Sequence, residues 1–107
     1  MVSFAHSSER EVASLLDSYG IRWHYEPTTF VLASDDDGNP TSAFTPDFYL
    51  PDFDTYIELT TLRQPLVTGK HRKIRRLQEL RPDVTVKILY RKDLERLGAK
   101  YGLADAA

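Results

Sequence analysis

The chain has 107 residues, 41% of them hydrophobic, and a formal net charge of −2. This length and composition predict one domain over residues 1–107, large enough to bury a core without disulfides or structural metals. The sequence has no cysteine, which excludes disulfides and thiolate zinc sites, and no apolar run approaches the ~20 residues that a membrane span needs.

The small net charge hides two halves of opposite sign. Residues 1–62 carry two arginines and no lysine against eleven carboxylates, a net charge of −9, whereas residues 63–100 carry twelve basic and four acidic side chains, a net charge of +8. Such asymmetry indicates contact with nucleic acid, unless the two halves neutralise each other across the fold. The first residues lack the basic-then-apolar layout of a signal peptide, which favours a cytoplasmic protein.

A helix is predicted near the start of the chain. Ser8 is a candidate N-cap, Glu11 completes its capping box, and Gly20 ends the helix. Between them four apolar residues recur at helical spacing: Val12, Leu15, Leu16 and Tyr19.

A run of short strands is predicted next. Residues 22–25 and 28–33 have β character, and the acidic stretch 35–40 reads as a surface loop. Strands over residues 44–50 and 55–62 then flank a turn at residues 51–54.

The basic half predicts a connection, a helix, a strand and a last helix. We expect the connection at residues 64–69, the helix at 70–80, a turn at 81–83, a strand at 84–90 and a short helix from Asp93. The order is one helix, three or four strands, a helix, a strand and a helix, which indicates an α/β domain. The strand before the basic helix and the strand after it should be parallel and joined by a right-handed crossover.

Two carboxylates stand on the strands around the turn. Asp47 lies in the first strand and Glu58 in the second, and antiparallel pairing across the turn can bring them side by side. Two carboxylates in contact cannot both ionise cheaply unless a cation bridges them. A hard cation such as Mg²⁺ suits such an oxygen site.

Pro46-Asp47, with Glu58 eleven residues later in this order of elements, resembles the PD-(D/E)xK nuclease superfamily. The resemblance covers residues 8–97 and is greatest to small members, the very-short-patch-repair-like endonucleases and Holliday-junction resolvases. It implies a restriction-endonuclease-like α-β-β-β-α-β core, a mixed sheet flanked by helices. It also implies hydrolysis of DNA with Mg²⁺ or Mn²⁺ held by Asp47, Glu58 and the first-helix residue Glu9. Small relatives often pair, so the resemblance also implies a homodimer.

The chain departs from the family pattern at Thr60, where the family has its lysine. At ~100° per residue, Lys70 and Lys73 fall on the apolar stripe of the basic helix, which is marked by Ile74, Leu77 and Leu80. Either lysine could therefore meet the carboxylates and replace the missing charge. The alternative is that both side chains extend outward along the core to solvent.

Two further acidic residues each have two possible interpretations. Glu9 lies beside the apolar stripe of the first helix, but a glutamate is also favoured there by the helix dipole. Glu26 ends a strand, and a surface role is the simpler interpretation. Contacts to DNA phosphates are expected from the basic half: Arg72, Arg75, Arg76, Arg91, Lys92 and Arg96.

Three functions are consistent with these residues. The first is a metal-dependent DNA endonuclease. The second, motivated by Thr60, is a nuclease-fold domain without catalysis that binds DNA or assembles a complex. The third is a protein-interaction module that uses the basic face.

Overall fold

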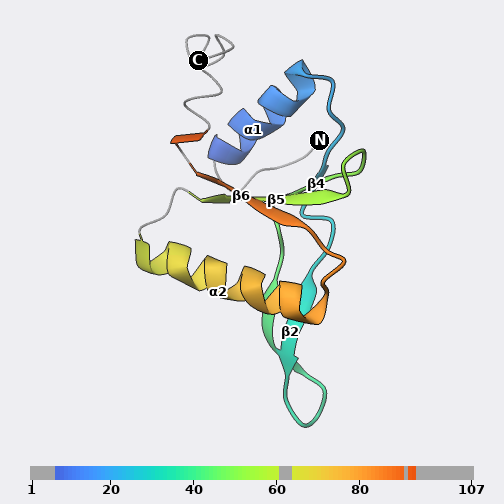
Figure 1. The fold of residues 1–107 in the computed structure, drawn as a ribbon, viewed down its shortest axis with the longest axis vertical. Coiled ribbons are helices and arrows are strands. Elements are labelled where there is room, and N and C mark those ends of the chain that lie inside the picture. Colours follow the sequence, from blue (N-terminus) through green and yellow to red (C-terminus); the bar gives the residue numbers. More distant parts are fainter. Residues whose placement is uncertain (1–6, 61–63, 91, 94–107) are drawn as a thin grey trace.

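The computed structural model describes residues 7–60, 64–90 and 92–93. Helix α1 comes first, five strands follow, and helix α2 and strand β6 complete the described part (Figure 1). The bounds are α1 Ser7–Ser18, β1 His24–Tyr25, β2 Phe30–Ser34, β3 Pro40–Phe44, β4 Phe48–Leu50, β5 Thr55–Thr60, α2 Gln64–Leu80 and β6 Val86–Tyr90.

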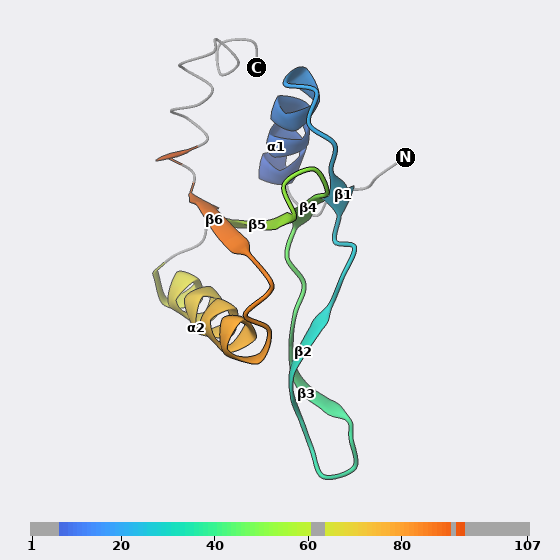
Figure 2. The same cartoon turned by 45° about the vertical axis from the view of Figure 1, so that its right-hand side comes forward.

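Four strands form a mixed sheet in the order β1-β4-β5-β6. The β1–β4 and β4–β5 pairs are antiparallel, and β5 pairs with β6 in parallel, as predicted for the strands on either side of the basic helix. Strands β2 and β3 form a separate antiparallel hairpin that projects away from this sheet (Figure 2). The prediction of an α/β fold with a mixed sheet flanked by helices is confirmed.

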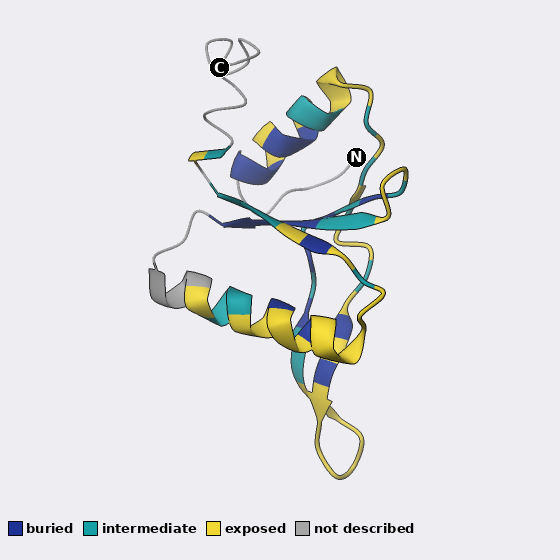
Figure 3. Ribbon diagram, in the orientation of Figure 1, coloured by how far each residue is buried: buried dark blue, intermediate teal, exposed yellow. Residues whose placement is uncertain are grey.

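Helix α1 covers one face of the sheet. Its residues Val12 and Ala13 are buried against Phe48 of β4 and against Ile57 and Leu59 of β5 (Figure 3). The helix begins at Ser7, one residue before the expected cap. It ends where predicted, because Gly20 adopts a φ of 69°, which costs glycine nothing.

Helix α2 and the β2–β3 hairpin enclose a second core on the opposite face. Ile74 and Leu77 of α2 are buried together with Phe30, Phe44 and Val86. Leu80 was predicted on the same apolar stripe but is 43% exposed, because it is the last residue of α2. The stripe therefore extends only to Leu77.

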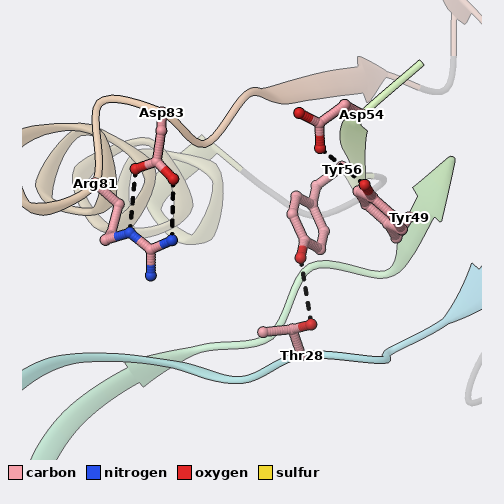
Figure 4. A network of polar contacts seen from close by, with 6 residues as sticks. All are labelled: Thr28, Tyr49, Asp54, Tyr56, Arg81 and Asp83. Atoms are coloured by element: carbon pink, nitrogen blue, oxygen red, sulfur yellow. Dashed lines mark hydrogen bonds and ion pairs between the residues drawn. The ribbon is translucent and has the colours of Figure 1, made fainter. Parts of the chain in front are cut away.

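Polar contacts join the elements around this second core (Figure 4). The Tyr56 hydroxyl of β5 lies 3.2 Å from Thr28 Oγ1, just before the hairpin. Arg81 forms two hydrogen bonds with the Asp83 carboxylate in the turn that ends α2, as the sequence predicted. The Tyr56–Thr28 contact thus holds the start of the hairpin at the sheet, whereas the Arg81–Asp83 pair stabilises the α2–β6 turn itself.

Three sequence predictions about the elements need correction or lie outside the described residues. Five strands precede α2 rather than three or four, because residues 40–44 pair with β2 although they lack apolar alternation. Residues 64–69, predicted as a connection, are helical, since Pro65 is compatible with the first turn of a helix. The last predicted helix lies outside the described residues, apart from residues 92–93.

Among the helices in the described ranges, none combines the length and apolar character that crossing a membrane would require.

Candidate functional site

Strands β4 and β5 bring the two predicted carboxylates together. The register pairs Phe48 with Ile57, so Asp47 and Glu58 are the next residues opposite each other. The backbone N–H of Asp47 donates to Glu58 Oε1 over 3.2 Å, and the backbone N–H of Leu59 donates to Asp47 Oδ2 over 2.8 Å. A backbone N–H of each strand thus donates to the carboxylate on the neighbouring strand. The two carboxylates lie side by side, as their spacing in the sequence predicted.

Two more carboxylates join this group from the other side of Asp47. Glu9 is buried on α1 and accepts a hydrogen bond of 2.9 Å from the Tyr25 hydroxyl. Glu26 has an exposed side chain and a φ of 45°, and its backbone N–H donates to the Asp47 carbonyl over 2.8 Å. Ligand oxygens of Glu9, Glu26 and Asp47 all lie within 4.8 Å of one another.

The membership of this cluster differs from the expected ligand set. Glu26 belongs to the cluster, although the sequence favoured a surface role for it. Its left-handed backbone conformation turns the chain beside Asp47. Glu58 is not one of the three clustered residues, and its Oε2 is paired with Lys70 instead. Only the position of Glu26 at the end of a strand, before Pro27, could have drawn attention to it in the sequence.

The crowding of negative charge has a direct effect on Asp47. Burial, with the neighbouring charge of Glu58 and a contact with Glu9, raises the pKa of Asp47 to about 8, although the Leu59 N–H acts in the opposite direction. A proton therefore neutralises this carboxyl at neutral pH. A divalent cation would remove the same repulsion, so this oxygen-rich set of donors fits Mg²⁺ or Mn²⁺.

The raised pKa of Asp47 makes stability depend on pH. Between its ordinary pKa of 3.8 and about 8, the folded protein holds a proton that the unfolded chain has released. Without divalent cations, the free energy of unfolding should therefore decrease as pH rises through this window and level off above it. Asp47→Asn should remove this decrease, as measured by thermal unfolding in EDTA between about pH 5 and about pH 9.

Asp35→Asn is the matched control. The backbone N–H of Asn39 lowers the pKa of Asp35. Asp35 is therefore ionised in both the folded and the unfolded protein over the measured range, from about pH 5 to about pH 9. The raised pKa of Asp47 would be contradicted if the free energy of unfolding changed with pH in the same way in Asp47→Asn and in the unchanged protein.

The structure distinguishes between the two candidate lysines. Lys70 Nζ lies 2.9 Å from Glu58 Oε2 and also donates to the Leu59 carbonyl over 2.6 Å. Lys73 is exposed and donates to the Ala43 carbonyl of β3 over 3.0 Å. Lys73 is one turn farther along α2, and that turn places it beside the hairpin instead of the carboxylates.

Thr60 lies on β5 two residues after Glu58 and carries no charge. It is buried, and its Oγ1 has no hydrogen-bond partner in the part of the chain that the structure describes. The ammonium group that contacts Glu58 belongs to Lys70 of α2.

Several of the residues predicted to contact DNA phosphates lie on the surface, and their contact with DNA stays a prediction. Arg72, Arg75 and Arg76 are exposed along α2, and Arg76 pairs with Glu79 at 3.3 Å. Lys92 is also exposed, whereas Arg91 and Arg96 lie outside the described residues. His71, which stands between Lys70 and Arg72 on α2, lies 2.9 Å from the Tyr90 hydroxyl through its Nε2.

Comparison of the chain with protein-family models, with curated proteins and with solved structures gave no match. The assignment of a function therefore depends on the chemistry of the site.

Proposed function

We propose that this protein is a metal-dependent endonuclease that hydrolyses phosphodiester bonds of DNA. The observation that carries the proposal is the ion pair between Lys70 and Glu58, directly beside Asp47. It combines carboxylate oxygens for a cation with an ammonium group for a phosphate. The resemblance to PD-(D/E)xK nucleases supports the same chemistry.

Each residue has a distinct task in this proposal. Asp47, Glu9 and Glu26 offer oxygens to the cation, with Glu58 as the neighbouring ligand. A bound Mg²⁺ or Mn²⁺ would polarise a phosphoryl oxygen and lower the pKa of a water molecule. Lys70 stabilises the negative charge that builds up on the phosphate, and the backbone N–H of Leu59 orients the Asp47 carboxylate.

A nuclease-fold domain without catalysis is the second candidate. It is favoured by the contacts of Lys70, whose Nζ already has two partners, Glu58 and the Leu59 carbonyl. If Lys70 serves only to neutralise Glu58, the carboxylates and the lysine would form a structural ion-pair network.

A cleavage assay separates the two candidates. Duplex, flapped, branched and single-stranded DNA are incubated with the protein in Mg²⁺ or Mn²⁺, with EDTA as the blank. Cleavage that requires the cation supports the endonuclease. Survival of every substrate in Mn²⁺ supports the non-catalytic domain.

Pairing of two copies of the chain stays a prediction, and light scattering in solution tests it.

DNA binding should decrease steeply with salt, since DNA releases its condensed counterions when exposed arginines neutralise its phosphates. The change to test is the replacement of Arg72, Arg75 and Arg76 by Ala. This triple change should reduce the slope of log affinity against log salt by roughly one unit per lost phosphate contact. Fluorescence anisotropy between about 50 and 200 mM salt in EDTA measures this slope.

Arg22→Ala serves as the control for this series. Arg22 pairs with Asp52 on the β4–β5 turn, away from α2. Its removal should leave the slope unchanged. An unchanged slope in the α2 triple variant would mean that the basic helix contacts something other than DNA.

A further inference from the structure

His71 and Tyr90 form a fixed polar pair that the proposed reaction does not use. His71 Nε2 on α2 lies 2.9 Å from the Tyr90 hydroxyl on β6, and both side chains are half-buried. A neutral imidazole and a phenol together carry two donor hydrogens, and their mutual bond consumes one. Whichever group donates, one N–H or O–H donor of the pair is left over for a ligand.

Lys92 adds a positive charge to this pair. Its Nζ lies 6.0 Å from the centre of the Tyr90 ring, and within the described residues it forms no ion pair. The nearby carboxylate of Asp93 accepts a hydrogen bond of 2.9 Å from the Tyr90 backbone N–H, so it already has a partner. His71, Tyr90 and Lys92 together offer donors and positive charge, which suit an anion.

Tyr90 lies on the same face of the sheet as Glu58, and His71 of α2 contacts Tyr90 on that face. In the parallel β5–β6 register, Glu58 pairs with Ile88 and Thr60 with Tyr90. Tyr90 is two residues along the strand from the partner of Glu58, roughly 6.6 Å at the usual rise of a β-strand. His71 directly follows Lys70, whose ammonium group contacts Glu58.

We propose that His71, Tyr90 and Lys92 form a second anion subsite, which binds the phosphate next to the one at the carboxylates. This inference rests on the proposed function, and it makes the substrate a strand with at least two consecutive phosphodiesters. The chemistry that the subsite recognises is a phosphate oxyanion. Free phosphate carries the same chemistry, so the experiment must separate the two sources.

The first arm uses inorganic phosphate and needs no catalysis. The imidazole signals of the three histidines are followed by NMR during titration with phosphate at constant ionic strength, without divalent cations. The His71 signal should shift and saturate, while the signals of His6 and His24 stay in place. Absence of a His71 shift would overturn the subsite.

Variants at Tyr90 and Lys92 test the same binding, with a variant at Lys87 of β6 as the control. Lys92→Ala should weaken phosphate binding by about tenfold, the scale of one hydrogen bond to a charged group. Tyr90→Phe, which keeps the ring, should weaken it as well. Lys87→Ala is the matched control, because Lys87 lies between Val86 and Ile88 and faces the other side of the sheet. Equal loss in the Lys87 and Lys92 variants would show a general charge effect and overturn the subsite.

The second arm separates the sources with two thymidine oligonucleotides in Ca²⁺. TpTpT, which has two phosphodiesters, should bind about tenfold more tightly than TpT, and His71→Gln should remove the difference. Equal binding of TpT and TpTpT to the unchanged protein, with the phosphate shift of His71 retained, would assign the subsite to free phosphate and overturn its nucleic-acid role.

Failure of this inference can be distinguished from failure of the proposed function. Cation-dependent cleavage without any phosphate effect on His71 would reject the subsite alone. A phosphate shift of His71 in a protein that cleaves no DNA in Mn²⁺ would reject the nuclease and leave a phosphate site.

Discussion

Lys70→Ala is expected to lower the rate of cation-dependent DNA cleavage by roughly 10²-fold or more, the scale of losing one electrostatic contact to the transition state. The reason is geometric, because Lys70 Nζ is held 2.9 Å from Glu58 at the carboxylates. The measurement is single-turnover cleavage at saturating protein, which reports the chemical step without the contribution of binding.

Two matched controls accompany this variant. Lys73→Ala removes the same charge from the same helix, but Lys73 contacts Ala43 on the hairpin, so its activity should stay within a few-fold of the unchanged protein. Thr60→Val removes the unpartnered hydroxyl while nearly preserving shape. Its activity should stay unchanged and its stability should increase, because a buried hydroxyl without a partner costs about 1–3 kcal/mol. Equal losses in Lys70→Ala and Lys73→Ala would contradict a specific role for Lys70.

Stability must be followed in parallel, because Glu58 is only 6% exposed at its side chain and would lose its counter-ion. Removing one partner of a buried ion pair costs about 3–5 kcal/mol in typical cases, although Lys70 is partly exposed and the loss here should be smaller. Cleavage is therefore assayed well below the melting temperature of each variant. The double change Lys70→Met with Glu58→Gln, which removes both charges, should recover stability but not cleavage.

Asp47→Asn is expected to abolish both binding of a divalent cation and DNA cleavage. Asp47 contacts both parts of the site, since it clusters with Glu9 and Glu26 and its backbone N–H donates to Glu58. The amide keeps an oxygen that can accept the Leu59 N–H, so the fold should survive while the charge is lost. Isothermal titration calorimetry with Mn²⁺ measures binding, and the cleavage assay measures function.

Replacing the other carboxylates should weaken cleavage or Mn²⁺ binding to different extents. Glu58→Gln should also abolish cleavage, whereas Glu26→Gln should weaken Mn²⁺ binding by about tenfold, because its side chain is exposed. Asp36→Asn, in the exposed β2–β3 turn, is the control for charge alone. Mn²⁺ binding with unchanged affinity in Asp47→Asn would show that the cation site lies elsewhere.

Cation binding should also depend on pH. Because the pKa of Asp47 is raised to about 8, a cation must displace its proton at neutral pH. Mn²⁺ affinity should therefore increase as pH rises toward about 8 and then level off. This dependence shares its cause with the stability change, so Asp47→Asn should remove both.

Local patterns in the sequence were sufficient to predict several features of the fold. The first helix, its end at Gly20 and the antiparallel strands around residues 51–54 depend on capping, glycine and β-forming residues. The pairing of Asp47 with Glu58 also follows from sequence, because a tight turn determines which residues stand opposite each other.

Only the tertiary structure could decide which distant side chains meet. Both Lys70 and Lys73 fall on the sheet-facing stripe of α2, and the position of the β2–β3 hairpin directs Lys73 to Ala43 and leaves Lys70 at Glu58. The hairpin itself could not be anticipated, since residues 40–44 become a strand only by pairing with β2. Glu26 joins Asp47 through a left-handed backbone conformation that nothing in its sequence requires. Local periodicity thus determined most of the elements, although not strand β3 or the first turns of α2, whereas packing between elements far apart in the chain determined the composition of the site.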